Sequence, residues 1–95
     1  MVNSSLIPNE FALKQNYPNP FNPTTKIEFA LPKEQFVILK IYNTAGQAVT
    51  TLVSRRLPAG TYRYSFDARD LTSGIYFYQI QTGEFHNVKK MVLIR

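Results

Sequence analysis

Side chains able to perform acid–base or nucleophilic chemistry are few and scattered in this sequence. The only histidine is His86, which stands beside a predicted turn. General-base catalysis needs a positioned partner, so a lone imidazole next to a hairpin is expected to be solvated and inert. The serines lie in no nucleophile elbow and no Ser-x-x-Lys box. We therefore expect no catalytic residue, and the chain is predicted not to be an enzyme.

Metal binding has one candidate, the loop that holds Asp67 and Asp70. Carboxylate oxygens are ligands that calcium prefers, so the pair could bind a weak calcium ion. Asp is also a common turn former, because its side chain caps local backbone N–H groups, and this interpretation is the stronger one. The chain has no Cys, which excludes thiolate zinc sites, iron–sulfur clusters and disulfides. We expect no metal and no cofactor.

The basic charge raises the question of an acidic partner. Eleven Lys and Arg against six Asp and Glu give a net charge of +5. A nucleic-acid groove needs clustered charge and stacking aromatic rings. Here the basic residues are spread over several predicted strands and most loops, and six of the thirteen aromatic residues fall on predicted inward rows. Nucleic acid is therefore not an expected partner, and only Lys89, Lys90 and Arg95 keep a claim to a functional role.

The least ordinary stretch is the proline segment, residues 16–23, which reads Asn-Tyr-Pro-Asn-Pro-Phe-Asn-Pro. Prolines fix φ and remove N–H donors, so the segment is predicted to be rigid, extended and outside the strands. Tyr17 and Phe21 are expected to be its apolar anchors. The segment is either a docking surface or a stiff lid over one end of the fold, and the lid is the favoured interpretation.

Alternation of apolar and polar residues dominates the rest of the chain and predicts strands. The inward rows are Ile27, Phe29 and Leu31; Val37, Leu39 and Ile41; Tyr62, Tyr64 and Phe66; Tyr76, Tyr78 and Ile80; and Met91 and Leu93. The strand around Leu39 is apolar on much of both faces, which predicts a central position. Ala48–Val53 alternates poorly, which predicts an irregular or bulged edge strand. A short strand is expected at Phe11–Leu13.

Turn signals separate these runs, including Asn43–Gly46, where Gly46 is expected to adopt a positive φ. Short strands at roughly ten-residue spacing predict an all-β fold, an immunoglobulin-like antiparallel β-sandwich of about seven strands. No apolar run is long enough to span a bilayer, and residues 1–5 lack the pattern of a signal peptide. Residues 1–10 are expected to be a linker end, and residues 11–95 one domain.

Several short motifs, taken in order, resemble the type A C-terminal sorting domain of the bacterial type IX secretion system. They are residues 15–23, Ile27-Glu28-Phe29 with Leu31-Pro32, Ile41-Tyr42-Asn43 through Gly46-Gln47, Pro58-Ala59-Gly60-Thr61-Tyr62, residues 71–78 with Gly74 and Tyr76, and Lys89-Lys90-Met91-Val92-Leu93. The motif positions in the first of these are Asn16, Tyr17, Pro18, Asn19, Pro20 and Phe21. The resemblance covers about residues 11–95 and also extends to the immunoglobulin-like domain of flagellar hook-capping proteins.

The resemblance implies a non-catalytic targeting domain at the end of a secreted protein of a Gram-negative bacterium. Its partners would be the N-terminal cargo domain and the type IX machinery, namely the outer-membrane translocon, the shuttle and the sortase. The cargo would cross the periplasm and end at the cell surface or outside the cell. The alternatives are an accessory carbohydrate-binding or adhesive module, which predicts an exposed aromatic platform, and a hook-cap-type assembly domain.

The expected recognition site is the C-terminal strand. Its residues are Lys89, Lys90, Met91, Val92, Leu93, Ile94 and Arg95. At a sheet edge, this strand would offer unpaired backbone groups and a basic rim to a receptor. The competing interpretation is a final core strand whose lysines provide solubility. Both can hold together if Met91 and Leu93 face inward while Lys90 and Arg95 face outward.

Overall fold

A computed structural model describes residues 7–95, and every regular element in that range is a β-strand. The strands are β1 (Ala12–Leu13), β2 (Thr24–Leu31), β3 (Gln35–Tyr42), β4 (Ala48–Leu57), β5 (Gly60–Asp67), β6 (Gly74–Gln81) and β7 (His86–Leu93). The predicted all-β fold is confirmed. Within residues 7–95 the chain has no helix that could cross a membrane. Most of the predicted linker, residues 1–6, lies outside the described residues, and residues 7–10 form no strand.

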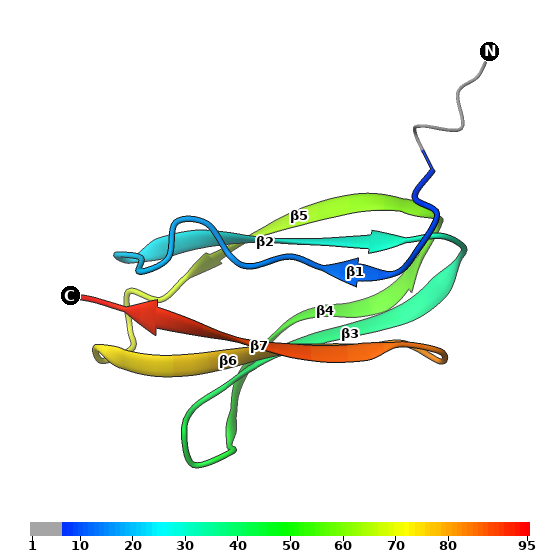
Figure 1. The fold of residues 1–95 in the computed structure, drawn as a ribbon. Helices are drawn as coiled ribbons and strands as arrows, with labels where there is room; N and C mark the ends of the chain where they lie inside the picture. Colours follow the sequence, from blue (N-terminus) through cyan, green and yellow to red (C-terminus); the bar gives the residue numbers. More distant parts are fainter. Residues whose placement is uncertain (1–6) are drawn as a thin grey trace.

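The strands form two antiparallel sheets that face each other (Figure 1). One sheet has the order β1-β2-β5 and the other the order β4-β3-β6-β7. The central position predicted for β3 is confirmed. The bulged edge strand is confirmed as β4, whose pairing with β3 shifts register after Leu39 and after Ile41. This strand runs on to Leu57, four residues beyond the predicted end at Val53.

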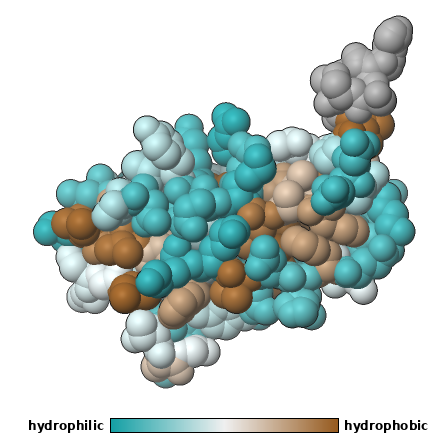
Figure 2. All heavy atoms as spheres, viewed as in Figure 1, coloured by the Kyte–Doolittle hydropathy of each residue, from teal (hydrophilic) through white to brown (hydrophobic). Residues whose placement is uncertain are grey.

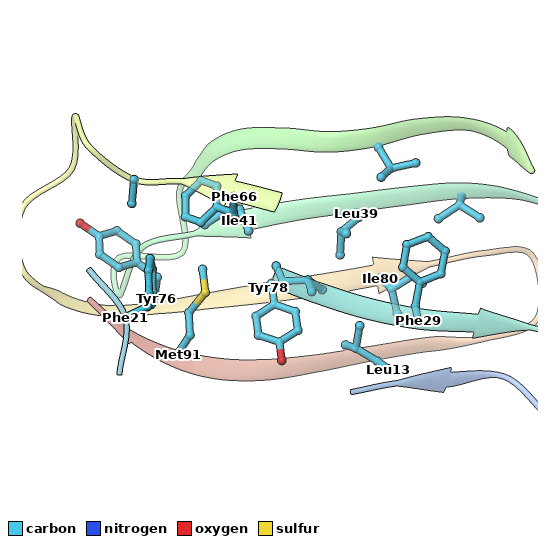
Figure 3. Close-up of a cluster of buried hydrophobic side chains, with 14 of the residues drawn as sticks. Leu13, Phe21, Phe29, Leu39, Ile41, Phe66, Tyr76, Tyr78, Ile80 and Met91 are labelled. Carbon is cyan, nitrogen blue, oxygen red and sulfur yellow. The ribbon is translucent and has the colours of Figure 1, made fainter. Parts of the chain in front are cut away.

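The core lies between the two sheets, and the predicted inward rows supply it (Figure 3). The row of β2, for example, is fully buried, with Ile27, Phe29 and Leu31 each at 0% exposure. The Phe29 ring stacks on Tyr62 and Tyr64, with ring centroids 5.4 and 5.9 Å apart. Such cross-strand aromatic pairs stabilise a sheet beyond the area that they bury. The tyrosines of β5 therefore pack against the core, as predicted.

The hairpin between β3 and β4 depends on Gly46, which adopts φ 80° as predicted. This left-handed conformation is unfavourable for residues with a Cβ atom. The side-chain oxygen of Asn43 accepts hydrogen bonds from the N–H groups of Ala45 and Gln47, at 2.9 and 3.0 Å. The loop is therefore closed by its own residues, and it projects from the body of the sandwich (Figure 1).

Candidate functional site

The C-terminal strand β7 lies at an edge of the four-stranded sheet, where β6 is its neighbouring strand. Its alternate residues face opposite sides. Met91 and Leu93 fill the core with 0% and 1% exposure, whereas Lys90 is exposed on the other side of the strand. The expected recognition strand therefore has one face that packs in the core and one face at the surface. Only the surface face is accessible to a partner.

The outward edge of β7 is largely covered by the proline segment. The N–H of Phe21 donates to the carbonyl oxygen of Val92, and the N–H of Ile94 donates to the carbonyl oxygen of Phe21, each at 2.9 Å. Two side chains complete the cover. The side-chain oxygen of Asn19 accepts from the Val92 N–H at 2.9 Å, and Nε2 of Gln15 donates to the Lys90 carbonyl at 2.8 Å.

For residues 90–94, this cover corrects the expectation that the terminal strand offers unpaired backbone groups to a receptor. From the Lys90 carbonyl to the Ile94 N–H, hydrogen bonds from residues 15–21 occupy the edge. Proteins protect edge strands in this way because an open edge pairs with other chains. Addition of a partner strand along residues 90–94 would require the proline segment to detach from β7.

The proline segment itself differs from its prediction in two respects. It is bent at residues 18–20 and 22–23, and not extended, because it crosses from the edge of β2 to the edge of β7. Phe21 is an anchor, as expected, with 2% exposure, but Tyr17 is 80% exposed. Tyr17 forms an antiparallel bridge with Lys26. Bridged residues share a face of the sheet, so Tyr17 points outward like Lys26.

A buried polar network holds the segment to both sheets. The Tyr78 hydroxyl, which reaches out of β6 toward the chain near β1 (Figure 3), accepts from the Asn16 N–H and donates to the Lys14 carbonyl, each at 2.7 Å. Nδ2 of Asn16 donates to the Thr25 hydroxyl at 2.9 Å and to the Pro18 carbonyl at 3.1 Å. The Thr25 hydroxyl also donates to this carbonyl at 2.8 Å. Each buried polar side chain of the network is therefore paired, as stable cores require.

Thr25 is a residue that the sequence reasoning missed. It is 1% exposed, although threonine is usually a surface residue. A signal was present, since Thr25 stands two positions before Ile27 and continues the inward row of β2.

Burial of Tyr78 leads to a prediction about alkaline pH. Burial raises the pKa of this hydroxyl to about 12, against a smaller opposing effect of the Asn16 hydrogen bond. Tyrosine in the unfolded chain ionises near pH 10, so the unfolded state loses its proton first. We expect the free energy of unfolding to fall by up to about 1.4 kcal/mol per pH unit between these two values. Below pH 10 this contribution is fully present.

Urea unfolding of the wild type and Tyr78→Phe from pH 8 to 12 measures this effect. The wild type should lose stability more steeply than the variant above pH 10, because the variant has no hydroxyl to ionise at this position. Equal slopes for the two proteins would show that Tyr78 has no raised pKa.

The last residue, Arg95, is fixed on the loop between β5 and β6. Its guanidinium Nη1 donates to the carbonyl oxygens of Ala68, Arg69 and Leu71, at 3.2, 2.6 and 2.7 Å. Its backbone N–H donates to the Ser73 hydroxyl at 2.9 Å. The proline segment and this loop thus secure the end of the chain from two sides.

The loop carboxylate Asp67 is engaged by Arg69. Oδ2 of Asp67 lies 2.6 and 2.9 Å from two guanidinium nitrogens, and Oδ1 accepts from the Arg69 N–H at 3.0 Å. Hydrogen bonds from the Arg69 side chain and backbone lower the pKa of this carboxyl. These contacts match the turn-forming role of Asp67. Residues 7–95 contain no group of three side chains suited to hold a metal ion.

Tyr17 and Phe36, the two most exposed aromatic residues, do not together form the platform that the carbohydrate-binding alternative predicts. Tyr17 is 80% exposed and Phe36 is 45% exposed. Tyr17 bridges to β2 in the three-stranded sheet, whereas Phe36 belongs to β3 in the four-stranded sheet. The two rings therefore lie on different sheets. On the side that carries β1 and β7, hydrophilic and hydrophobic residues are intermixed (Figure 2).

The fold and the secured terminal strand define a small antiparallel β-sandwich module of the immunoglobulin-like class. A family model described as a secretion system C-terminal sorting domain matches residues 15–94. The match covers most of the chain, and the chain therefore belongs to the family of secretion system C-terminal sorting domains. The family prediction made from the motifs is confirmed.

One solved structure supports the fold. It is PorZ of Porphyromonas gingivalis, described as an essential bacterial surface component of the type IX secretion system, with a TM-score of 0.60 and 22% sequence identity. The similarity covers 90% of this chain and 11% of the PorZ chain, so this chain spans about a tenth of its neighbour. No curated protein matches the sequence.

Proposed function

We propose that this domain directs a cargo protein, fused at its N-terminal side, through the type IX secretion system for release or cell-surface attachment. The observation that carries the proposal is the family match over residues 15–94, a range that includes strands β2 to β7. Family membership makes the domain a sorting signal of an exported protein. The cargo, its route and its receptor are the proposed parts.

The route follows from this assignment. The cargo crosses the inner membrane by means of its own signal peptide, and the folded domain is recognised in the periplasm. The shuttle and the outer-membrane translocon are the partners during export, and a sortase separates the domain from the cargo at the cell surface. None of these steps needs a catalytic group in the domain.

A signal that is read as a folded domain must stay folded without help. This domain is small, so it buries a modest fraction of its surface, and it has no disulfide to offset that limit. The proline segment, the Tyr78 network and the Arg95 contacts compensate by fixing residues 14–21 and the C-terminal strand to the sandwich. These features support a role in which the terminal strand is presented in one conformation.

Fusion of the 95-residue chain to a periplasmic reporter in a type IX-competent host tests the proposal. We expect the reporter on the cell surface or in the medium, and in the periplasm of a strain without the translocon. The reporter without the domain is the control and should stay in the periplasm of both strains. A folded fusion that stays in the periplasm of the competent host would refute the proposed function.

A further inference from the structure

The two sheets present different outer faces, where outer means turned away from the other sheet. On the three-stranded sheet the outer pairs are polar, such as Lys26 opposite Ser65 and Glu28 opposite Arg63. The latter two form an ion pair at 3.2 Å. Apart from Tyr17, which is bridged to Lys26, such a face is typical of a sheet that is exposed to water.

The outer face of the four-stranded sheet carries apolar side chains on both sides of a polar middle row formed by Lys40 and Gln79. Cross-strand register and burial place six apolar side chains there, and we call them the apolar face: Ile38, Tyr42, Ile75, Phe77, Val88 and Val92. Two of them are well exposed, with 53% of Val88 and 41% of Ile75 accessible to solvent. An apolar group of this kind on an antiparallel outer face, where polar residues are the rule, indicates an interaction surface.

A shallow hollow of about 340 Å³ opens at one end of the apolar face. It is lined by Tyr42, Phe77, Gln79 and Val88 from the strands and by residues of the β3–β4 hairpin. That hairpin projects beyond the sheet (Figure 1) and gives the hollow a wall. A side chain of a partner could therefore be received at this end.

The charged side chains on this face are basic along most of its length. Lys40 lies opposite Gln79, and Lys90 lies opposite Phe77. The ion pairs of residues 7–95 involve Lys33, Arg56, Arg63 and Arg69, so neither lysine takes part in one. The acidic ion-pair partners near this sheet are Glu34, which contacts Arg56 beside Phe36, and Glu84 of the β6–β7 hairpin, which contacts Lys33. Both lie at the end of the sheet where β3 begins. Complementary surfaces place opposite charges across an interface, so the matching surface is acidic.

We propose that the apolar face, with Lys40 and Lys90 among its side chains, docks a protein of the export machinery that presents carboxylates interspersed with apolar groups. This inference rests on the proposed function and names the surface that carries it. The covered edge of β7 supports the choice, because strand addition is blocked between residues 90 and 94. The side chains of Lys90 and Val92 remain accessible on the outer face without any rearrangement.

Charge reversal tests the surface directly. In the reporter fusion of the 95-residue chain, Lys40→Glu with Lys90→Glu should reduce export by about tenfold or more, because like charges would then face each other. The matched control is Lys14→Glu with Lys26→Glu, which makes the same charge change on exposed lysines at the three-stranded sheet. Export of this control and of Lys40→Arg with Lys90→Arg should stay near the wild-type level. Thermal unfolding of each domain verifies that it is folded.

The outcomes separate the two proposals. If the wild-type fusion is exported and both charge-reversed pairs behave alike, the docking surface is wrong while the proposed function stands. If the wild-type fusion is not exported, the proposed function fails and the docking surface fails with it.

Two further measurements address other occupants of the face. Dimerisation of the domain that Phe77→Ser abolishes, detected by sedimentation, would assign the face to a second copy of this chain. Flotation with anionic vesicles that is lost in Lys40→Glu with Lys90→Glu would assign it to a lipid surface. Either result would overturn the protein-docking proposal.

Discussion

Phe21→Ala is expected to lower the free energy of unfolding by about 3–5 kcal/mol, the usual cost of truncating a buried phenylalanine. The Phe21 ring is 2% exposed and lies 6.2 Å from the Phe66 ring. Its removal leaves a cavity under the proline segment, where the backbone bridges to Leu93. Small domains are stable by about 5–15 kcal/mol, so this single change removes a large share of the total.

Urea unfolding followed by tyrosine fluorescence measures the effect, since the chain has six Tyr and no Trp. Tyr17→Ala is the matched control in the same segment. Because Tyr17 is 80% exposed, its truncation should change stability by no more than about 0.5 kcal/mol. Equal losses for the two variants would mean that Tyr17 also anchors the segment.

The strands could be predicted from the sequence because their signal is local. An inward row such as Ile27, Phe29 and Leu31 repeats every two residues, and the same period decides which side chains enter the core. The bulge of β4 was visible in the same way, as a break in the alternation. The full length of β4 was not predicted, because residues 54–56 are polar and lie on an edge strand, where exposure does not follow a simple pattern.

The arrangement around the proline segment could not be predicted, because its contacts join residues far apart in the sequence. Asn19 and Val92 are 73 residues apart, and Gln15 and Lys90 are 75 residues apart. Proline fixes the backbone locally but does not specify which strand the segment will meet. The same reason explains why the prediction for Tyr17 was wrong. Its aromatic ring suggested an apolar anchor, but its bridge to Lys26 places the side chain on the outer face of the sheet.

The seven residues proposed for receptor recognition can be sorted by the structure, although their role remains a proposal. Met91 and Leu93 belong to the core, and the guanidinium of Arg95 is directed at loop carbonyls. Lys90 and Val92 lie on the outer face of the sheet, in register with Phe77 and Ile75. Loss of export after removal of the whole strand would therefore combine unfolding with loss of recognition.

Leu93→Ala is the substitution that separates these two effects at the chain end. Leu93 is 1% exposed, so the truncation should lower the free energy of unfolding by about 2–5 kcal/mol. The adjacent Ile94 is 53% exposed, and Ile94→Ala should change stability by no more than about 0.5 kcal/mol. If the machinery reads the folded domain, export of Leu93→Ala should fall with its folded fraction and recover at a temperature where it is folded. Export that stays low for a fully folded Leu93→Ala domain would instead show that Leu93 is itself recognised, which requires β7 to leave the sandwich during export.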